Sequence, residues 1–195
     1  MTGESHRKGD TDSPLLDETI GEMLEKTTAR VGDRDAIVDM ATGRRWTYAE
    51  LDDVVNRVAT GLLDLGVKKG DRVGIWAPNC AEWTLTQYAA AKVGAILVNV
   101  NPAYRTHEFT YALEQSGMRM LISAERFKTS DYRGMIEQVQ AADNGSRLER
   151  VVYIGTSDWS DLVAAGDRPV GTYSGGMKRR IDIACGLVVR PEVVF

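Results

Sequence analysis

Gly94-Ala95-Ile96-Leu97-Val98-Asn99-Val100-Asn101-Pro102 contains an apolar run that follows a glycine and ends before an Asn-Pro turn. A short run of this kind predicts a β-strand, and its lack of polar alternation predicts a strand covered on both faces, as in a parallel sheet. Further strands are predicted at residues 72–77, 118–123 and 151–154. Because helical patterns alternate with these strands, the sequence predicts an α/β domain with a largely parallel sheet and right-handed connections.

Turn and cap residues place the helices between the strands. Thr47-Tyr48-Ala49-Glu50 has the spacing of a capping box, and the apolar residues that follow recur at three- and four-residue steps up to Gly66. Asn79 is expected to cap a helix that runs to Lys92, and Thr106 one that ends at Gly117. The remaining elements are a first helix over residues 15–31, a strand–turn–strand over 36–46 and a helix over 132–142.

Composition limits the class of protein. The 195 residues allow one core, or one domain with a short appendage, and 43% hydrophobic with 27% charged residues indicates a globular chain. A net charge of −4 argues against a nucleic-acid partner. Cys80 and Cys185 lie far apart, as in proteins of a reducing compartment, and both are expected to be buried. No run is long enough for a transmembrane segment, so we expect a cytoplasmic protein with a disordered leader at 1–14.

Several linked motifs occur in a fixed order and carry a family resemblance. Together they resemble the N-terminal region of AMP-forming acyl-CoA synthetases, within the adenylate-forming superfamily, over about residues 15–165. The fold implied is an incomplete adenylate-forming-type N-terminal domain. The motifs are Trp46-Thr47-Tyr48-Ala49-Glu50-Leu51, Gly66-Val67-Lys68-Lys69-Gly70-Asp71-Arg72-Val73, Ala77-Pro78-Asn79-Cys80-Ala81-Glu82-Trp83 and Ala91-Lys92-Val93-Gly94-Ala95-Ile96-Leu97-Val98-Asn99-Val100-Asn101-Pro102-Ala103-Tyr104-Arg105.

The resemblance implies a two-step reaction. A fatty or other carboxylic acid attacks the α-phosphate of ATP, Mg²⁺ neutralises the developing charge, and CoA then displaces AMP from the acyl adenylate. The family's phosphate-binding loop, Thr-Glu pair, ribose-binding aspartate and C-terminal lysine have no counterpart in this chain. No catalytic residue and no metal ligand is therefore predicted. Tyr104 and Arg105 could gate a substrate and Glu82-Trp83 could line a pocket, but structural roles are favoured for them and for His107.

The tail carries a second resemblance. Gly171-Thr172-Tyr173-Ser174-Gly175-Gly176-Met177-Lys178-Arg179-Arg180, the apolar helix pattern after it and Val193-Val194-Phe195 resemble the signature segment of an ABC transporter ATP-binding subunit. This resemblance implies a short helix–strand tail over 167–195, in which Ser174, Gly175 and Gly176 contact ATP held by a partner ABC ATPase subunit. A Walker A loop is absent, so the tail is not expected to hydrolyse ATP by itself.

Three hypotheses follow. The first is a chimeric or truncated fragment of an acyl-CoA ligase, inactive alone, with a leader at 1–14, a partial AMP-binding domain at 15–166 and a partial ABC segment at 167–195. The second is an ABC-derived module that contacts ATP in trans. The third is an inert remnant that folds poorly because its sheet is incomplete.

Overall fold

A four-stranded parallel sheet organises the part of the chain that the computed structural model describes, residues 16–142 and 148–166. Its strand order is β4-β3-β5-β8, and each neighbouring pair runs parallel. The predicted α/β fold with a parallel-rich sheet is therefore confirmed. The strands are β3 (Arg72–Trp76), β4 (Ile96–Asn99), β5 (Met120–Ser123) and β8 (Arg150–Tyr153).

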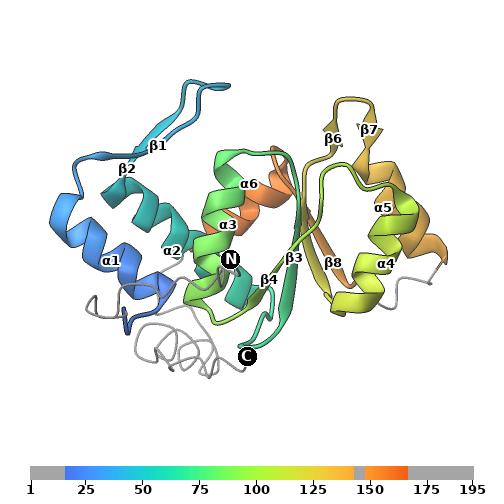
Figure 1. Cartoon of the computed structure of the whole chain (residues 1–195), viewed down its shortest axis with the longest axis horizontal. Coiled ribbons are helices and arrows are strands. Elements are labelled where there is room, and N and C mark those ends of the chain that lie inside the picture. The colour runs from blue at the N-terminus through green and yellow to red at the C-terminus, as the bar shows by residue number, and fades with distance from the viewer. Residues whose placement is uncertain (1–15, 143–147, 167–195) are drawn as a thin grey trace, which may run out of the picture.

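Helices cover both faces of this sheet, so the domain has two cores (Figure 1). One core lies between the sheet and three helices and includes Val73, Leu85 and Leu162. The other lies between the sheet and two helices and includes Trp76 and Phe109. The three helices are α2 (Tyr48–Asp64), α3 (Ala81–Lys92) and α6 (Ser157–Ala165), the two are α4 (Thr106–Ser116) and α5 (Tyr132–Ala142), and Leu24 of the N-terminal helix adds to the first core.

The N-terminal part adds a helix and a hairpin to the first helical layer. Helix α1 (Ile20–Val31) packs on α2 and α3, and an antiparallel hairpin of β1 (Asp35–Val38) and β2 (Arg45–Thr47) extends away from the sheet (Figure 1). A second, very short hairpin joins β6 (Arg126–Phe127) to β7 (Ser130–Asp131). The sequence prediction included the first hairpin and missed both the second hairpin and α6.

The predicted capping box at the start of α2 is present. The Glu50 amide donates to Thr47 Oγ1 at 3.2 Å, and the Thr47 amide donates to Glu50 Oε2 at 2.8 Å. Gly66 follows the end of α2 with a φ of +90°, a conformation that favours glycine. The first helix begins at Ile20 rather than near residue 15, because Thr19 and Glu22 form a second capping box.

Two other predicted caps are wrong. Helix α3 begins after Cys80, whose backbone is extended and whose side chain makes no cap hydrogen bond, so Asn79 lies one residue too early. Thr106 is already the first residue of α4, and Glu108 supports the helix start by accepting the Arg105 amide at 3.0 Å. In both cases a capping side chain lies next to the N-cap position, which residue type alone does not resolve.

The expectation that the strand at 95–100 is covered on both faces holds in part, because Ala95 packs against the first core and Val98 against the second. However, strand β4 is an edge of the sheet among the described residues, and Ile96 is 53% exposed. An apolar run indicates that a strand prefers to be buried. The position of that strand within the sheet depends on how successive strands are connected. Cys80, expected to be buried, is half-buried.

The tail at 167–195, the leader and the loop at 143–147 lie outside the described residues. This includes Cys185 and the predicted helix–strand tail.

Helix α2 passes so close to α6 that Gly61 has no room for a side chain. A Cβ there would collide with the Leu162 carbonyl oxygen. We expect Gly61→Ala to lower the free energy of unfolding by about 1–3 kcal/mol, the usual cost of overpacking. Gly134→Ala in α5 is the control, because its Cβ would meet only the movable Asp131 carboxylate at 3.1 Å. Urea denaturation compares the two, and equal stabilities would contradict the packing argument.

Candidate functional site

The strand order identifies the edge of the sheet where a ligand is expected. The chain after β3 leads to α3 on one face of the sheet, whereas the chain after β5 leads through the β6–β7 hairpin to α5 on the other face. The loops that follow β3 and β5 therefore diverge at the carboxyl ends of these strands, where open α/β sheets bind ligands. This edge is the first place to look for a site.

Aromatic side chains fill the space directly at this point. Trp76, the last residue of β3, stacks between Phe109 and Tyr132 with ring centroids 4.5 and 4.2 Å away. Its Nε1 donates to the Asn101 carbonyl at 3.1 Å, and the Ser123 hydroxyl donates to the Trp76 carbonyl at 3.1 Å. Because these side chains fill the space between the two diverging loops, that space belongs to the core and is not an open crevice.

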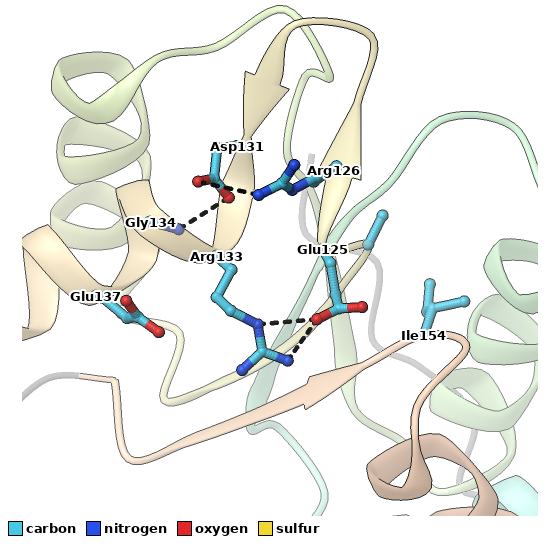
Figure 2. A pocket seen from close by; sticks show the side chains of 8 residues that line it. Glu125, Arg126, Asp131, Arg133, Gly134, Glu137 and Ile154 are labelled. Atoms are coloured by element: carbon cyan, nitrogen blue, oxygen red, sulfur yellow. Dashed lines mark hydrogen bonds and ion pairs between the residues drawn. The ribbon is translucent and has the colours of Figure 1, made fainter.

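An open pocket lies one strand further along the same edge, at the carboxyl ends of β5 and β8 (Figure 2). Its volume is about 470 Å³, within the range of small-molecule pockets. The loop after β5, the short β6–β7 hairpin and the first turns of α5 form its walls. The lining residues are Ala124, Glu125, Arg126, Asp131, Arg133, Gly134, Glu137 and Ile154.

Arg133 is the best-anchored charged group of this pocket. Its guanidinium contacts Glu125 Oε1 through Nε at 2.9 Å and Nη2 at 2.7 Å, and it lies 3.9 Å from the centroid of the Tyr153 ring. The hydrogen bond to Glu125 raises the pKa of Arg133 above its ordinary value. Burial raises the pKa of Tyr153, and the nearby Arg133 cation opposes that shift. Arg133 thus remains a fixed cation against an aromatic wall.

The second guanidinium of the pocket, that of Arg126, is more exposed than that of Arg133 and makes a longer ion pair. Arg126 lies 4.0 Å from Asp131, and its side chain is 78% exposed. Asp131 in turn accepts the Gly134 amide at 3.3 Å in the first turn of α5. Three carboxylates, those of Glu125, Asp131 and Glu137, thus face two guanidinium groups, and the pocket can hold a small polar group by charge and hydrogen bonding. Its lining contains no serine, cysteine, histidine or lysine, so the groups in the lining that could act as nucleophiles are its carboxylates.

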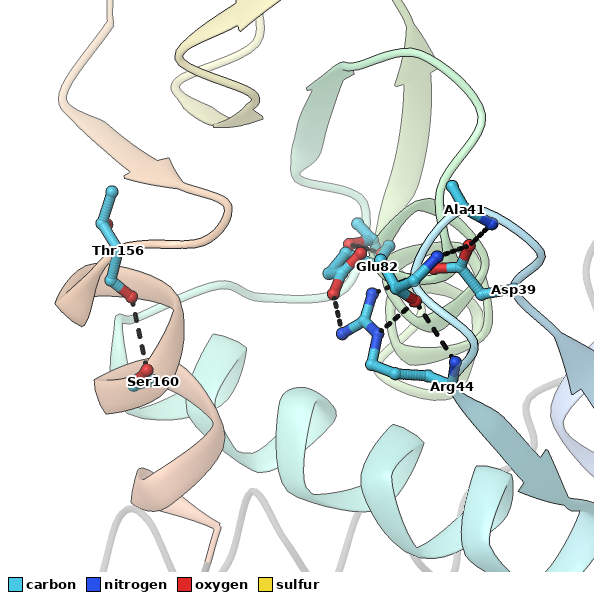
Figure 3. Close-up of polar contacts among 8 residues, drawn as sticks. Asp39, Ala41, Arg44, Glu82, Thr156 and Ser160 are labelled. Carbon is cyan, nitrogen blue, oxygen red and sulfur yellow. Dashed lines mark hydrogen bonds and ion pairs between the residues drawn. The ribbon is translucent and has the colours of Figure 1, made fainter.

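A second polar cluster fixes the hairpin to the start of α3. Glu82 is 7% exposed, and its carboxylate receives Arg44 Nη1 at 2.7 Å (Figure 3). Arg44 also contacts Asp39 Oδ2 at 3.2 Å and lies 5.0 Å from the centroid of the Trp46 ring. The hydrogen bond to Glu82 raises the pKa of Arg44, so the guanidinium stays charged. The cluster joins segments 38 residues apart and has a structural role.

The residues singled out in the sequence do not form the pocket. Tyr104 is half-buried against the second core, Arg105 and His107 are exposed at the start of α4, and Glu82 is held by Arg44. The site predicted at Ser174, Gly175 and Gly176 lies outside the described residues. Sequence reasoning missed the pocket, although Glu125 to Asp131 lie between a predicted strand and a predicted helix, at the carboxyl edge of a parallel sheet.

Magnesium does not fit the residues present. Over 16–142 and 148–166, no group of three His, Cys, Asp or Glu side chains is arranged to hold a metal ion. Mg²⁺ takes carboxylate oxygens in near-octahedral geometry, and the carboxylates of Glu125 and Asp131 are engaged by arginines and by the amide of Gly134. No helix in the same residues is long and apolar enough to cross a membrane.

Comparison with known proteins connects this fold to a family. Residues 24–174 match the family of AMP-binding enzymes. The chain belongs to this family. It is 43% identical over 137 residues to the mitochondrial medium-chain acyl-CoA ligase ACSF2 of Macaca fascicularis, covering 70% of this chain and 22% of that protein. The Mus musculus ligase is 37% identical over 182 residues, covering 85% of this chain and 30% of the relative.

Solved structures of the family show the same architecture. The inhibitor-bound N-terminal domain of FACL13 from Mycobacterium tuberculosis superposes with a TM-score of 0.68 at 29% identity, covering 80% of this chain and 38% of that domain. A fatty acyl CoA synthetase from the same organism gives the same TM-score and identity, with 30% of its chain covered. The AMP-binding domain predicted from the motifs is therefore confirmed as to family, and the chain spans less than a third of the two curated ligases.

The ion pair of Arg44 with the buried Glu82 predicts an unequal effect of removing two neighbouring arginines. Arg44→Met leaves the Glu82 carboxylate buried without its cation, so we expect a loss of about 1–3 kcal/mol in the free energy of unfolding. Arg45→Met, which removes an exposed pair with Asp35 in the same hairpin, should cost about 1 kcal/mol or less. Adding Glu82→Gln to Arg44→Met should restore part of the loss. Equal losses in the two single variants, measured by chemical denaturation, would refute this role of Arg44.

Proposed function

We propose that this chain is the N-terminal portion of the AMP-binding domain of an acyl-CoA ligase. The observation that carries the proposal is the match of residues 24–174 to AMP-binding enzymes, together with 43% identity to a medium-chain acyl-CoA ligase. The reaction proposed for the whole enzyme is ATP-dependent adenylation of a carboxylic acid followed by formation of a CoA thioester. A medium-chain fatty acid is the proposed substrate, by analogy with the name of that relative.

The lack of a hydroxyl, thiol or amine nucleophile in the pocket lining is compatible with this chemistry. In adenylation the attacking group is the carboxylate of the substrate, and the enzyme contributes binding, orientation and stabilisation of charge. The described residues provide a rigid sheet, two cores and a polar pocket, but no arrangement for Mg²⁺. We therefore propose that they support the reaction as a scaffold and do not perform adenylation by themselves.

A domain exchange tests this scaffold function. Residues 24–174 of this chain would replace the matching region of the mouse ligase, and ATP–pyrophosphate exchange would be measured with a medium-chain fatty acid. We expect the hybrid to show exchange that depends on the fatty acid, and the 195-residue chain alone to show none. A hybrid that also carries Gly61→Ala is the control for disturbed packing between α2 and α6. We expect this hybrid to unfold more easily than the first hybrid and still to catalyse the exchange.

Two results would contradict the proposal. One is a hybrid that unfolds cooperatively yet catalyses no exchange, because a compatible scaffold should keep the relative's chemistry in place. The other is exchange by the 195-residue chain alone, which would show that this chain holds a complete adenylation site. Thermal unfolding of each protein, recorded in parallel, separates loss of fold from loss of activity.

We propose a second function for the tail, based on its sequence only. Ser174, Gly175 and Gly176 would contact ATP held by an ABC ATPase partner, in a chain that joins parts of two proteins. The AMP-binding match and the acyl-CoA ligases described above lend this idea no support. ATP-dependent association with an ABC ATPase subunit should be abolished by Ser174→Arg and kept by Thr172→Ser. Association that Ser174→Arg leaves unchanged would end the proposal.

A further inference from the structure

Tyr132, the first residue of α5, lies between two residues of the pocket. Asp131 and Arg133, its neighbours in the chain, both belong to the pocket lining (Figure 2). The Tyr132 side chain is completely buried in the second core, where its ring stacks on Trp76 with the centroids 4.2 Å apart. Tyr132 therefore connects the core to the pocket within one turn of the helix.

The Tyr132 hydroxyl binds a loop that lies 30 residues earlier in the chain. It donates to the Pro102 carbonyl at 2.7 Å, a distance typical of a well-formed hydrogen bond from a hydroxyl. Burial raises the pKa of Tyr132, so the hydroxyl keeps the proton that it donates. Trp76 donates to the carbonyl of the preceding residue, Asn101, at 3.1 Å. Two stacked rings thus hold two consecutive carbonyls of one loop.

This loop is itself held in place. The Val100 amide, directly before the loop, donates to the Ile75 carbonyl of β3 at 2.9 Å. Within the loop, Asn101 accepts the Ala103 amide through its side chain at 2.9 Å and the Tyr104 amide through its carbonyl at 3.0 Å. The loop is therefore attached to the central strand and offers a fixed acceptor to α5.

Arg133 depends on the orientation of the first turn of α5. Its amide donates to the Glu125 carbonyl at 3.1 Å, and its guanidinium lies between the Glu125 carboxylate and the Tyr153 ring. A binding group has to be held to within about 0.5 Å by contacts that lie outside the site. Because the arginine side chain is long, a small rotation of this turn would move the guanidinium out of both contacts.

We propose that Tyr132 is a positioning residue of the pocket. Its hydroxyl, bound to Pro102, fixes the first turn of α5 and thereby holds the Arg133 guanidinium between Glu125 and Tyr153. Tyr132 does not line the pocket itself and acts through Arg133. It has this role whichever ligand occupies the pocket, so the role goes beyond the proposed function and does not depend on it.

A role in apolar packing alone is the alternative. Phenylalanine would then serve equally well at this position, because it keeps the ring that stacks on Trp76 and lacks only the hydroxyl. Burying a hydroxyl costs free energy unless it forms a hydrogen bond, and the Pro102 carbonyl supplies that bond. Tyr132→Phe therefore separates the positioning role from packing.

NMR spectroscopy of the 195-residue chain, with isotope-labelled arginine, tests the proposal. The Arg133 Nε–H donates to Glu125 at 2.9 Å and reports whether the guanidinium is in place. We expect Tyr132→Phe to make the exchange of this hydrogen with water about fivefold faster, the effect of losing one hydrogen bond. The nuclear Overhauser contact between Arg133 and the Tyr153 ring should weaken in the same variant.

Two controls separate a local change from a general one. Tyr111→Phe removes a hydroxyl from a side chain that is 64% exposed on α4, and it should leave the Arg133 exchange rate within about twofold of the wild type. The Arg72 Nε–H, which donates to the Ser116 carbonyl at 3.0 Å at the amino end of β3, is the internal reference. Its exchange rate should stay the same in every variant.

Pro102→Gly disturbs the same hydrogen bond from its other end. It keeps the carbonyl that accepts the bond and gives the loop backbone more freedom. We expect it to shift the Arg133 signals in the same direction as Tyr132→Phe. Urea denaturation of each variant shows whether it is folded, and Pro102→Gly decides the question if Tyr132→Phe fails to fold.

The outcomes are distinct. Faster exchange at Arg133 alone, in Tyr132→Phe and in Pro102→Gly, supports the positioning role. Equal exchange at Arg133 in the wild type and in folded Tyr132→Phe overturns it, in favour of packing. Faster exchange at both Arg133 and Arg72 also overturns it, because that result shows a general loss of stability. No activity is measured, so the result is independent of the domain exchange that tests the proposed function.

Discussion

The double burial of β3 is the constraint on which the rest of the structure depends. Val73, Ile75 and Trp76 are completely buried, and β3 pairs on one side with β4 and on the other with β5. Gly74 has no side chain because the Met118 sulfur and Leu121 occupy the space that a Cβ would need. Each core therefore packs against this strand. The connections that follow it determine where α3 and α4 lie, and with them the Arg133 pocket and the Arg44–Glu82 cluster.

Charged side chains then fix the outer helices to this centre. Lys92, at the end of α3, has only 9% of its side chain exposed and reaches Glu25 in α1 at 2.9 Å, with Asp52 and Asn56 in α2 at 2.8 Å. A cation buried to this degree is tolerated because three oxygen atoms replace its water. Arg44 has the same function at the other end of α3. The helical layer is thus held by ionic contacts at both ends of one helix and by apolar packing between them.

Local signals in the sequence predicted the helices and strands. Contacts between residues that lie far apart in the sequence could not be predicted from it. The Thr47–Glu50 box, the helix end at Gly117 and the apolar strands depend on residues within a few positions of one another, so they could be read directly. The order of strands could not, because β3 contains an arginine and a glycine yet lies inside the sheet, whereas the wholly uncharged β4 lies at its edge. The pocket could not be predicted for the same reason, because Arg133 contacts Tyr153 only through the pairing of β8 with β5 in the sheet.

A scaffold whose polar pocket contains guanidinium and carboxylate groups suits the reaction proposed above, in which both reacting groups come from substrates. Adenylation joins a substrate carboxylate to a nucleotide phosphate, so the protein must mainly hold charges in fixed positions. Arg133 illustrates how the fold does this: a carboxylate and an aromatic ring hold its guanidinium at a strand end, and little rotational freedom is left to lose when a ligand binds. Such pre-organisation depends on β5 and β8 remaining in register, and β5 is held in turn by its pairing with the buried strand β3.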